Sequence, residues 1–582
     1  MTTSAPSAAL PAALSVRDLT VSFQGRGGTR TTAVDGLSFE LERGEVLGLV
    51  GESGSGKSTV GLAAMGLHDP ARTRVSGSVL VGGTQVVGAP ESAVRALRGS
   101  RIGMVFQDAL AALSPFHTVG AQVAEAYRVH APAGAGRRAE AREKALAMLE
   151  RVGIPAARAR DYPHQFSGGM RQRVMIAMAL VNSPDVVIAD EPTTALDARV
   201  QRQILGLLAE LREESGTAVL LVTHDVGVVA GTCDRMLVMR GGRGLEEGPT
   251  RKLLTDAAHP YTRALIGAAP TLNTVPGTRL PTVDAPVPTV DVPLPVPASV
   301  PEPALDAAGQ ERSPVAPAPA RPLAEVVGLR VEFGGRRGLL RRGRDRGAVQ
   351  AVRDVSLRID AGETLGLVGE SGSGKSTTAR VLAGLQRPTS GEVRFDGRDI
   401  SRAAGDTRLR RELSRDVQLV FQDPYTSLNP RRTVEEIVTT PLRVHTGLDK
   451  GERRARAAEL LEQVGLRTAH LHRYPHEFSG GQRQRIGIAR ALALRPRLVI
   501  ADEPVSALDV SVQAQVLNLL MDLRAELGLS LLFVSHDLAV VRHFCDRVAV
   551  MRAGSVVESG PRDEVFDDPK APYTRELLAA TM

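Results

Sequence analysis

Two glycine-rich segments have the composition of phosphate-binding loops. Each reads Gly-Glu-Ser-Gly-Ser-Gly-Lys-Ser, at residues 51–58 and 369–376, and each follows an apolar run and precedes a helical pattern. Glycines let backbone N–H groups converge on phosphate oxygens, and the lysine and the last serine supply contacts to phosphate and to Mg²⁺. We therefore expect ATP and Mg²⁺ here, bound in the first segment by Gly51, Ser53, Gly54, Ser55, Gly56, Lys57, Ser58 and Thr59, and in the second by Gly369, Ser371, Gly372, Ser373, Gly374, Lys375, Ser376 and Thr377.

An Asp-Glu pair ends a buried-looking apolar run in each half of the chain. The pairs are Asp190-Glu191 and Asp502-Glu503. An aspartate at such a strand tip can hold Mg²⁺, usually through water, and the adjacent glutamate can act as general base toward an attacking water. Alone, either pair could be an acidic helix cap. Beside the phosphate-binding loops, the pairs indicate two ATP-hydrolysing sites, with Mg²⁺ ligands Ser58, Asp190, Ser376 and Asp502.

These motifs recur at a nearly constant offset, which indicates a duplicated domain. The loop lysines are 318 residues apart, and the aspartates of the Asp-Glu pairs are 312 apart. We expect domains at 14–270 and 323–582, a disordered tail at 1–13, and a linker at 271–322 that holds 13 of the 36 prolines. Proline keeps such a segment extended, so it predicts a passive tether rather than a docking site for a partner.

Within each copy, continuous apolar runs such as 186–189 and 218–222 alternate with helical patterns such as 200–211. This alternation predicts an α/β fold with a mainly parallel sheet. No run approaches 18 apolar residues, so we expect no segment that spans a membrane. A formal charge of +7 on 582 residues does not argue for an acidic partner or a lipid surface. Cys233 and Cys545 lie in matching Cys-Asp-Arg tripeptides, which predicts two equivalent buried thiols in a reducing compartment.

The sequence Phe-Ser-Gly-Gly at 166–169 and 478–481 resembles the signature motif of ABC-type ATPases. The resemblance implies two P-loop NTPase domains, each with a parallel core, a small antiparallel β subdomain and a helical subdomain. It also implies that each signature contacts the γ-phosphate held by the opposite domain, through Ser167, Gly168, Gly169, Ser479, Gly480, Gly481 and Gln482. Met170 replaces the usual glutamine in the first signature.

Other positions match the same family. Gln107 and Gln422 resemble the Q-loop glutamine, which ligates Mg²⁺ and couples to a membrane partner; His224 and His536 resemble the switch histidine at the γ-phosphate. Residues 194–197 and 506–509 resemble the D-loop. Phe23 and Phe333 match the aromatic that stacks on adenine, although either could be a core residue of the first strand of its copy.

The segment 421–430 closely resembles the Q-loop of oligopeptide and dipeptide importer ATPases, and Pro-Tyr-Thr-Arg at 260–263 and 572–575 is typical of that group. The resemblance implies a peripheral subunit at the cytoplasmic face of the membrane, with two transmembrane permeases and an extracytoplasmic solute-binding protein as partners. Many relatives carry cysteines after the first Pro-Tyr-Thr; here none follows, so we expect no iron–sulfur centre.

The transported solute stays open between dipeptides, longer peptides, glutathione and nickel chelates. The alternative function is a tandem ABC translation factor on the ribosome, but such factors have a charged helical linker, and this linker is proline-rich. We expect no nucleic acid partner. Six arginines within 336–346 could touch lipid or nucleic acid, or form a solvated hairpin.

Overall fold

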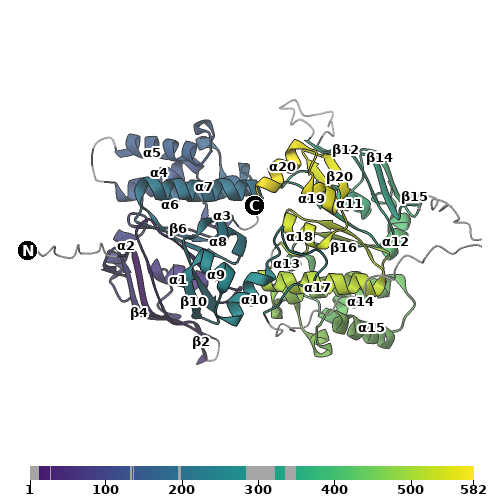
Figure 1. The fold of residues 1–582 in the computed structure, drawn as a ribbon, viewed down its shortest axis with the longest axis horizontal. Helices are drawn as coiled ribbons and strands as arrows, with labels where there is room; N and C mark the ends of the chain where they lie inside the picture. Colours follow the sequence, from purple (N-terminus) through teal and green to yellow (C-terminus); the bar gives the residue numbers. More distant parts are fainter. Residues whose placement is uncertain are drawn as a thin grey trace, which may run out of the picture. The chain divides into compact units, whose positions relative to one another are not determined.

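The fold was obtained as a computed structural model and is drawn in Figure 1 with the sequence coloured from purple to yellow. It describes residues 12–581 except 26–27, 132–133, 135–136, 194–197, 284–320, 335–348 and 507. The arginine-rich stretch at 336–346 and the first D-loop motif therefore lie outside the described residues. The chain divides into two compact units, formed mainly by Met1–Thr271 and by Leu272–Ala507 with Gln515–Ala579.

The first unit contains two sheets. An antiparallel sheet has the order β2 (Arg30–Leu41), β1 (Leu14–Gln24), β4 (Thr73–Val81), β5 (Thr84–Gln85). The core sheet has the order β10 (Arg243–Pro249), β9 (Arg235–Arg240), β3 (Val46–Val50), β8 (Ala218–Thr223), β7 (Val186–Asp190), β6 (Ile102–Val105), and all its pairs are parallel except β10 with β9. Every residue of β3, β7 and β8 is buried, as continuous apolar runs require when both faces of a sheet are covered.

Helices of the first unit cover this core sheet and build a helical subdomain from α4, α5 and α6, which pack on one another. The α-helices are α1 (Lys57–Ala64), α2 (Glu91–Leu97), α3 (Ala109–Ala112), α4 (Val119–His130), α5 (Arg137–Arg151), α6 (Gly168–Leu180), α7 (Ala198–Ser215), α8 (Val226–Thr232), α9 (Thr250–Asp256) and α10 (Pro260–Ala268). Short 3-10 helices η2 (Ala156–Arg160) and η3 (Pro163–Gln165) precede α6.

The second unit repeats this plan with its strands in one sheet. Their order is β15 (Arg398–Asp399), β14 (Ser390–Phe395), β11 (Ala324–Phe333), β12 (Val349–Ile359), β20 (Ser555–Pro561), β19 (Arg547–Arg552), β13 (Thr364–Val368), β18 (Ser530–Val534), β17 (Leu498–Asp502), β16 (Val417–Val420). The antiparallel and parallel parts join at β12 and β20, where Asp354 pairs with Ser555. The predicted mainly parallel α/β core and small antiparallel sheet are thus confirmed in both copies.

The helices of the second unit follow the same order along the chain. They are α11 (Lys375–Leu382), α12 (Thr407–Asp416), α13 (Pro424–Ser427), α14 (Val434–His445), α15 (Lys450–Gln463), α16 (Gly480–Leu492), α17 (Val510–Leu527), α18 (Leu538–Phe544), α19 (Arg562–Asp567) and α20 (Pro572–Ala579), with 3-10 helices η4 (Thr468–His472) and η5 (Pro475–Glu477). In the part of the chain that the structure describes, no helix is both long and apolar enough to span a membrane.

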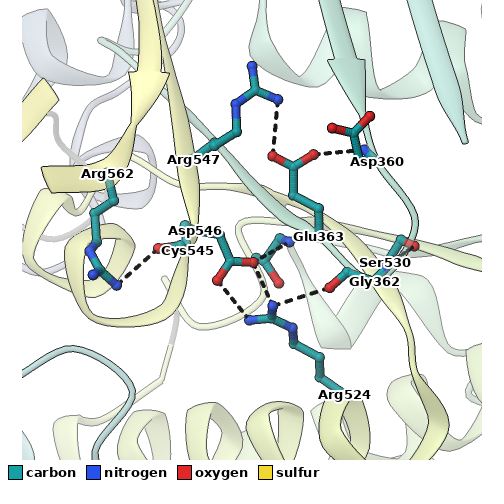
Figure 2. A network of polar contacts seen from close by, with 10 residues as sticks. Asp360, Gly362, Glu363, Arg524, Ser530, Cys545, Asp546, Arg547 and Arg562 are labelled. Carbon is teal, nitrogen blue, oxygen red and sulfur yellow. Dashed lines mark hydrogen bonds and ion pairs between the residues drawn. The ribbon is translucent and has the colours of Figure 1, made fainter. Parts of the chain in front are cut away.

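A polar network ties together the N-terminal ends of strands in the second sheet (Figure 2). Glu363, just before β13, accepts a hydrogen bond from Arg547 at the start of β19 over 3.0 Å. Asp546 accepts from Thr364 N over 2.8 Å and from Arg524 Nη2 on α17 over 2.6 Å. The first unit contains the same pairs, Glu45–Arg235 and Asp234–Arg212. These bonds fix how the neighbouring strands are positioned along their axes. The opposite ends of these strands lead into the site residues.

The two cysteines and residues 272–283 have defined places in the fold. Cys233 and Cys545 are both free and buried, as predicted, and burial raises the pKa of the Cys233 thiol to about 12. Residues 272–283, which we expected in the linker, belong instead to the second unit and pack on it. Contacts with the second unit hold residues 272–283 there, although their proline content predicted an extended linker.

Candidate nucleotide-hydrolysis sites

The phosphate-binding loops end in a glycine whose backbone no other residue adopts easily. Gly56 and Gly374, the residues before α1 and α11, have φ of +100° and +103°. A Cβ at Gly56 would lie 2.4 Å from Ala33 O, and one at Gly374 would lie 2.5 Å from Ala351 O. Glycine is therefore required for each loop to turn into its helix, which leaves the first N–H groups of that helix facing the loop.

The loop lysines are buried against their own loops. Lys57 is 6% exposed and donates to Gly51 O over 2.7 Å and Glu52 O over 2.8 Å. Lys375 repeats this at 4% exposed, with 2.6 Å to Gly369 O and 2.9 Å to Glu370 O. Burial lowers the pKa of Lys57. Phosphate oxygens are stronger acceptors than carbonyls, so each ammonium is placed to exchange these bonds for a phosphate.

The two side chains predicted to hold Mg²⁺ in each copy lie in direct contact. Ser58 Oγ on α1 donates to Asp190 Oδ1 at the end of β7 over 3.0 Å, and Ser376 Oγ donates to Asp502 Oδ1 over 2.8 Å. Burial raises the pKa of Asp190 to about 6 and also raises that of Asp502. A hydroxyl and a buried carboxylate side by side form the hard oxygen set that Mg²⁺ prefers, so these residues fit the ion.

The glutamate after each aspartate has an unusual backbone. Glu191 and Glu503 both have a φ of +47°, in the left-handed region that costs a side-chain-bearing residue roughly 1–3 kcal/mol. Each is the first residue after a core strand, and its N–H donates to a neighbouring strand, to Val222 O and Val534 O respectively. The same left-handed backbone recurs in both copies, at the residue predicted to act as general base.

Each of these glutamates contacts the glutamine and the histidine that resemble the Q-loop and switch residues. Gln107 Nε2 donates to Glu191 Oε2 over 2.7 Å, and His224 Nδ1 lies 3.0 Å from Glu191 Oε1. The second copy has the same arrangement, with 2.6 Å from Gln422 to Glu503 and 3.4 Å from His536 to Glu503. The structure thus brings three predicted residues of each copy together at one carboxylate, and in the first copy Gln107 and His224 are 117 residues apart in the sequence.

Each histidine lies beside a carboxylate that raises its pKa. Burial alone would lower the pKa of His224 and of His536, but the hydrogen bond to the glutamate and its charge outweigh burial and raise both. Burial alone would raise the pKa of Glu503, but the hydrogen bond and charge of His536 lower it. Both histidines are therefore favoured in the charged form, and in the second copy the charged form of the carboxylate is favoured as well.

The signature serines begin helices α6 and α16. Ser167 Oγ accepts from Met170 N, and Ser479 Oγ accepts from Gln482 N, each over 3.4 Å. Gln482 Oε1 also accepts from Ser479 N over 3.2 Å, a second cap that Met170 cannot make. Among the described residues, no hydrogen bond joins Ser167, Gly168, Gly169, Ser479, Gly480 or Gly481 to the phosphate-binding loop of the same unit.

The two aromatic candidates differ in their surroundings. Phe23 is the second-last residue of β1, packs partly buried against the core of the first unit and meets His68 edge-on, with ring centroids 5.7 Å apart. Phe333 ends β11 and is 44% exposed. The core alternative accounts for the position of Phe23, whereas the exposed ring of Phe333 leaves a face open to a ligand.

One pair of contacts was not expected from the sequence. Tyr261 Oη of the Pro-Tyr-Thr segment on α10 donates to Glu52 Oε2 in the phosphate-binding loop over 3.4 Å, and Glu370 N donates to Tyr573 Oη over 3.4 Å in the second copy. Arg240 lies over the ring of Tyr261 at 4.8 Å. The C-terminal helix of each copy therefore braces its loop, and only the recurrence of the tyrosine motif could have signalled this.

Comparison with known proteins identifies the family of this arrangement. The model for ABC transporters matches residues 34–194 and 352–506. The chain belongs to the ABC transporter family. We therefore call its two units the first and the second cassette, and the predicted ATP-binding function and ATPase class are confirmed.

The subfamily is also identified. The model for the oligopeptide/dipeptide transporter C-terminal region matches residues 245–292 and 557–582, which include both Pro-Tyr-Thr segments. The oligopeptide transport ATP-binding protein OppD of Mycobacterium tuberculosis is 46% identical over 97% of this chain and 98% of its own length. The glutathione import ATP-binding protein GsiA of Salmonella typhimurium is 48% identical over 97% of this chain and 89% of its own length. These relatives do not support the translation-factor alternative.

Proposed function

We propose that this chain is the ATP-hydrolysing subunit that energises an importer of peptides across the cytoplasmic membrane. The observation that carries the proposal is that both cassettes hold a complete set of hydrolytic groups in the same geometry. Each has a buried loop lysine, a Ser–Asp contact, and a strained glutamate bonded to Gln and His. The similarity to OppD and GsiA supports peptides as the solute class.

The loop residues bind ATP, the substrate. Backbone N–H groups at the start of α1 and α11, together with Lys57 and Lys375, would hold the β- and γ-phosphates. Ser58 with Asp190, and Ser376 with Asp502, would hold Mg²⁺. Gln107 and Gln422 would lie near the ion, because each donates a hydrogen bond to the glutamate that follows the metal-binding aspartate. When bound, Mg²⁺ neutralises negative charge on the phosphates.

Glu191 and Glu503 act as general bases. Each carboxylate orients a water and takes its proton while the water oxygen attacks the γ-phosphorus; the bond from that phosphorus to the β-bridging oxygen breaks, and ADP and phosphate leave. Gln107 and His224 fix the carboxylate of Glu191 through its two oxygens, so it needs little reorganisation to meet the water. The protonated histidine then adds positive charge on the side of the γ-phosphate.

The resemblance to importer ATPases supports two transmembrane permeases and an extracytoplasmic solute-binding protein as partners, and a peripheral place at the cytoplasmic face of the membrane. The relatives are named for oligopeptide transport and for glutathione import, so short peptides, including modified ones, are the solutes to test first. Their identity is set by the partners rather than by the cassettes.

Uptake of labelled peptides tests this function. A strain lacking this chain should lose ATP-dependent uptake of at least one member of a panel of di-, tri- and pentapeptides and glutathione. Wild-type chain should restore the uptake, and the double variant Glu191→Gln/Glu503→Gln should not. Normal uptake of the whole panel by the deletion strain would rule out the importer role, and recovery of the chain with ribosomes rather than membranes would favour the translation-factor alternative.

A further inference from the structure

The phosphate-binding loop of each cassette packs on a strand hairpin near the C-terminal end of the same cassette. In the first cassette a Cβ at Gly51 would clash with Met239 O, near the end of β9, so the loop backbone lies directly on that strand. Gly242 N, in the turn between β9 and β10, donates to Ser55 O over 3.1 Å. The second cassette repeats both contacts, with Gly369 on Met551 O and with Gly554 N donating to Ser373 O over 3.0 Å.

A tyrosine from the last helix of each cassette adds a further contact, to the second residue of the loop. Tyr261 on α10 is 3% exposed, and its Oη donates to Glu52 Oε2 over 3.4 Å. Burial and the charge of Glu52 raise the pKa of this phenol, although the N–H of Glu52, which also faces the phenol oxygen, lowers it. Tyr573 on α20 is 4% exposed, and the N–H of Glu370 donates to its Oη over 3.4 Å. In both cassettes the phenol oxygen therefore lies against the backbone of the same loop position.

Each tyrosine is itself held in place from two sides. Arg240 at the end of β9 lies 4.8 Å over the ring in the first cassette, and Arg552 at the end of β19 lies 4.6 Å over the ring in the second. Glu246 on β10 accepts hydrogen bonds from the N–H groups of the two residues before α10, over 2.7 and 3.1 Å. Glu558 on β20 does the same before α20, over 2.7 and 3.1 Å. The hairpin thus fixes both the ring and the start of the helix to which the ring belongs.

The loop residue that the tyrosine contacts also contacts the phosphate-binding lysine. Glu52 O accepts from Lys57 Nζ over 2.8 Å, and Glu370 O accepts from Lys375 Nζ over 2.9 Å. The loop glutamate also places a negative charge in a segment that binds phosphates, and like charges repel when the carboxylate turns toward the nucleotide. A hydroxyl that holds the backbone and, in the first cassette, the carboxylate of this residue therefore favours phosphate binding.

We propose that Tyr261 and Tyr573 are positioning residues for ATP, which hold the second residue of each phosphate-binding loop and thereby set the nucleotide affinity of each cassette. The inference rests on the nucleotide sites proposed above and not on the importer role. A loop that is already held in its binding conformation loses less conformational freedom when ATP binds. Loss of the hydroxyl should therefore weaken ATP binding and leave the chemical step, at Glu191 and Glu503, unchanged.

Removal of both hydroxyl groups tests the positioning role. The double variant Tyr261→Phe/Tyr573→Phe keeps both rings beneath their arginines. It should raise KM for ATP and the dissociation constant of a non-hydrolysable ATP analogue about 2- to 10-fold, the effect of one lost hydrogen bond per site, while kcat stays within about twofold. The matched control is Tyr127→Phe, which removes a tyrosine–glutamate bond of 2.6 Å to Glu140 in the helical subdomain and should change neither constant.

The variant Lys57→Ala/Lys375→Ala separates failure of this inference from failure of the nucleotide sites. If it binds the analogue as tightly as the wild type, the loops do not hold the nucleotide, and the positioning role is overturned together with the sites. If it loses binding while Tyr261→Phe/Tyr573→Phe keeps wild-type affinity, the positioning role alone is overturned. Tyrosines that serve only the stability of the fold would lower the active fraction, and so kcat, at unchanged KM, and that result would overturn the positioning role as well.

Discussion

Replacing the two proposed general bases by glutamine isolates the chemical step from ATP binding. Glu191→Gln and Glu503→Gln keep the size of the side chain and one carbonyl oxygen for a hydrogen bond, but remove the charge and the ability to take a proton. Loss of a general base costs about 10²- to 10⁴-fold in rate. The double variant should therefore hydrolyse ATP at least about 100-fold more slowly than the wild type.

The single variants report on how the two sites share the work. Both glutamates have a φ of +47°, and their bonds to glutamine are 2.7 and 2.6 Å long. Similar geometry predicts similar activity, so each single variant should retain about half of the wild-type rate if the sites turn over independently, and less if they are coupled.

The assay is phosphate release at saturating Mg²⁺ and ATP, beside a fluorescent-nucleotide binding measurement. Binding should stay within about threefold of wild type, because Lys57 and Lys375 are untouched. Glu526→Gln, on the exposed end of α17, is the control and should retain full activity. A double variant that keeps more than about a tenth of the wild-type rate would refute the role of these glutamates.

Three further predictions concern the same sites. Lys57→Ala should weaken nucleotide binding to the first cassette about 10- to 100-fold by equilibrium titration, since a charge-assisted bond to phosphate is lost; unchanged affinity would contradict the loop assignment. Gly374→Ala should lower the thermal midpoint by several degrees, because its Cβ would lie 2.5 Å from a carbonyl oxygen, whereas Gly487→Ala in α16, with nothing within 4 Å, should not. The pKa of His536 is raised and that of Glu503 is lowered, so their ion pair should stabilise the folded chain at pH values between these two pKa values. This stabilisation should weaken as pH rises through the pKa of His536. His536→Gln should therefore lower the thermal midpoint more at pH 6 than at pH 9, and an equal loss at both pH values would exclude the ion pair.

Many of the site residues could be predicted from the sequence, because they lie in short continuous motifs. A glycine-rich loop between an apolar run and a helix predicts its own conformation, and the helix indeed begins at Lys57. The contact between Ser58 and Asp190 could be anticipated because both were assigned to one ion, although 132 residues separate them. The parallel core followed from runs such as 186–189, which are buried throughout.

Other features depend on long-range packing and carry no local signal. The left-handed backbone of Glu191 is imposed by the turn that leaves β7, and glutamate shows no preference for it. The brace from Tyr261 to Glu52 joins residues 209 positions apart. The contact of Leu280 with Asn518 was hidden by proline-rich neighbours of Leu280, which suggested a free tether, and nothing in the sequence marks Asn518 as its partner.

The position of bound nucleotide tests the central claim most directly. A high-resolution structure of the double variant Glu191→Gln/Glu503→Gln with Mg²⁺ and ATP should show two nucleotides per chain, one with its phosphates on Lys57 and a metal ion at Ser58 and Asp190, the other likewise at Lys375, Ser376 and Asp502. ATP bound elsewhere, or phosphates that touch neither lysine, would contradict the account.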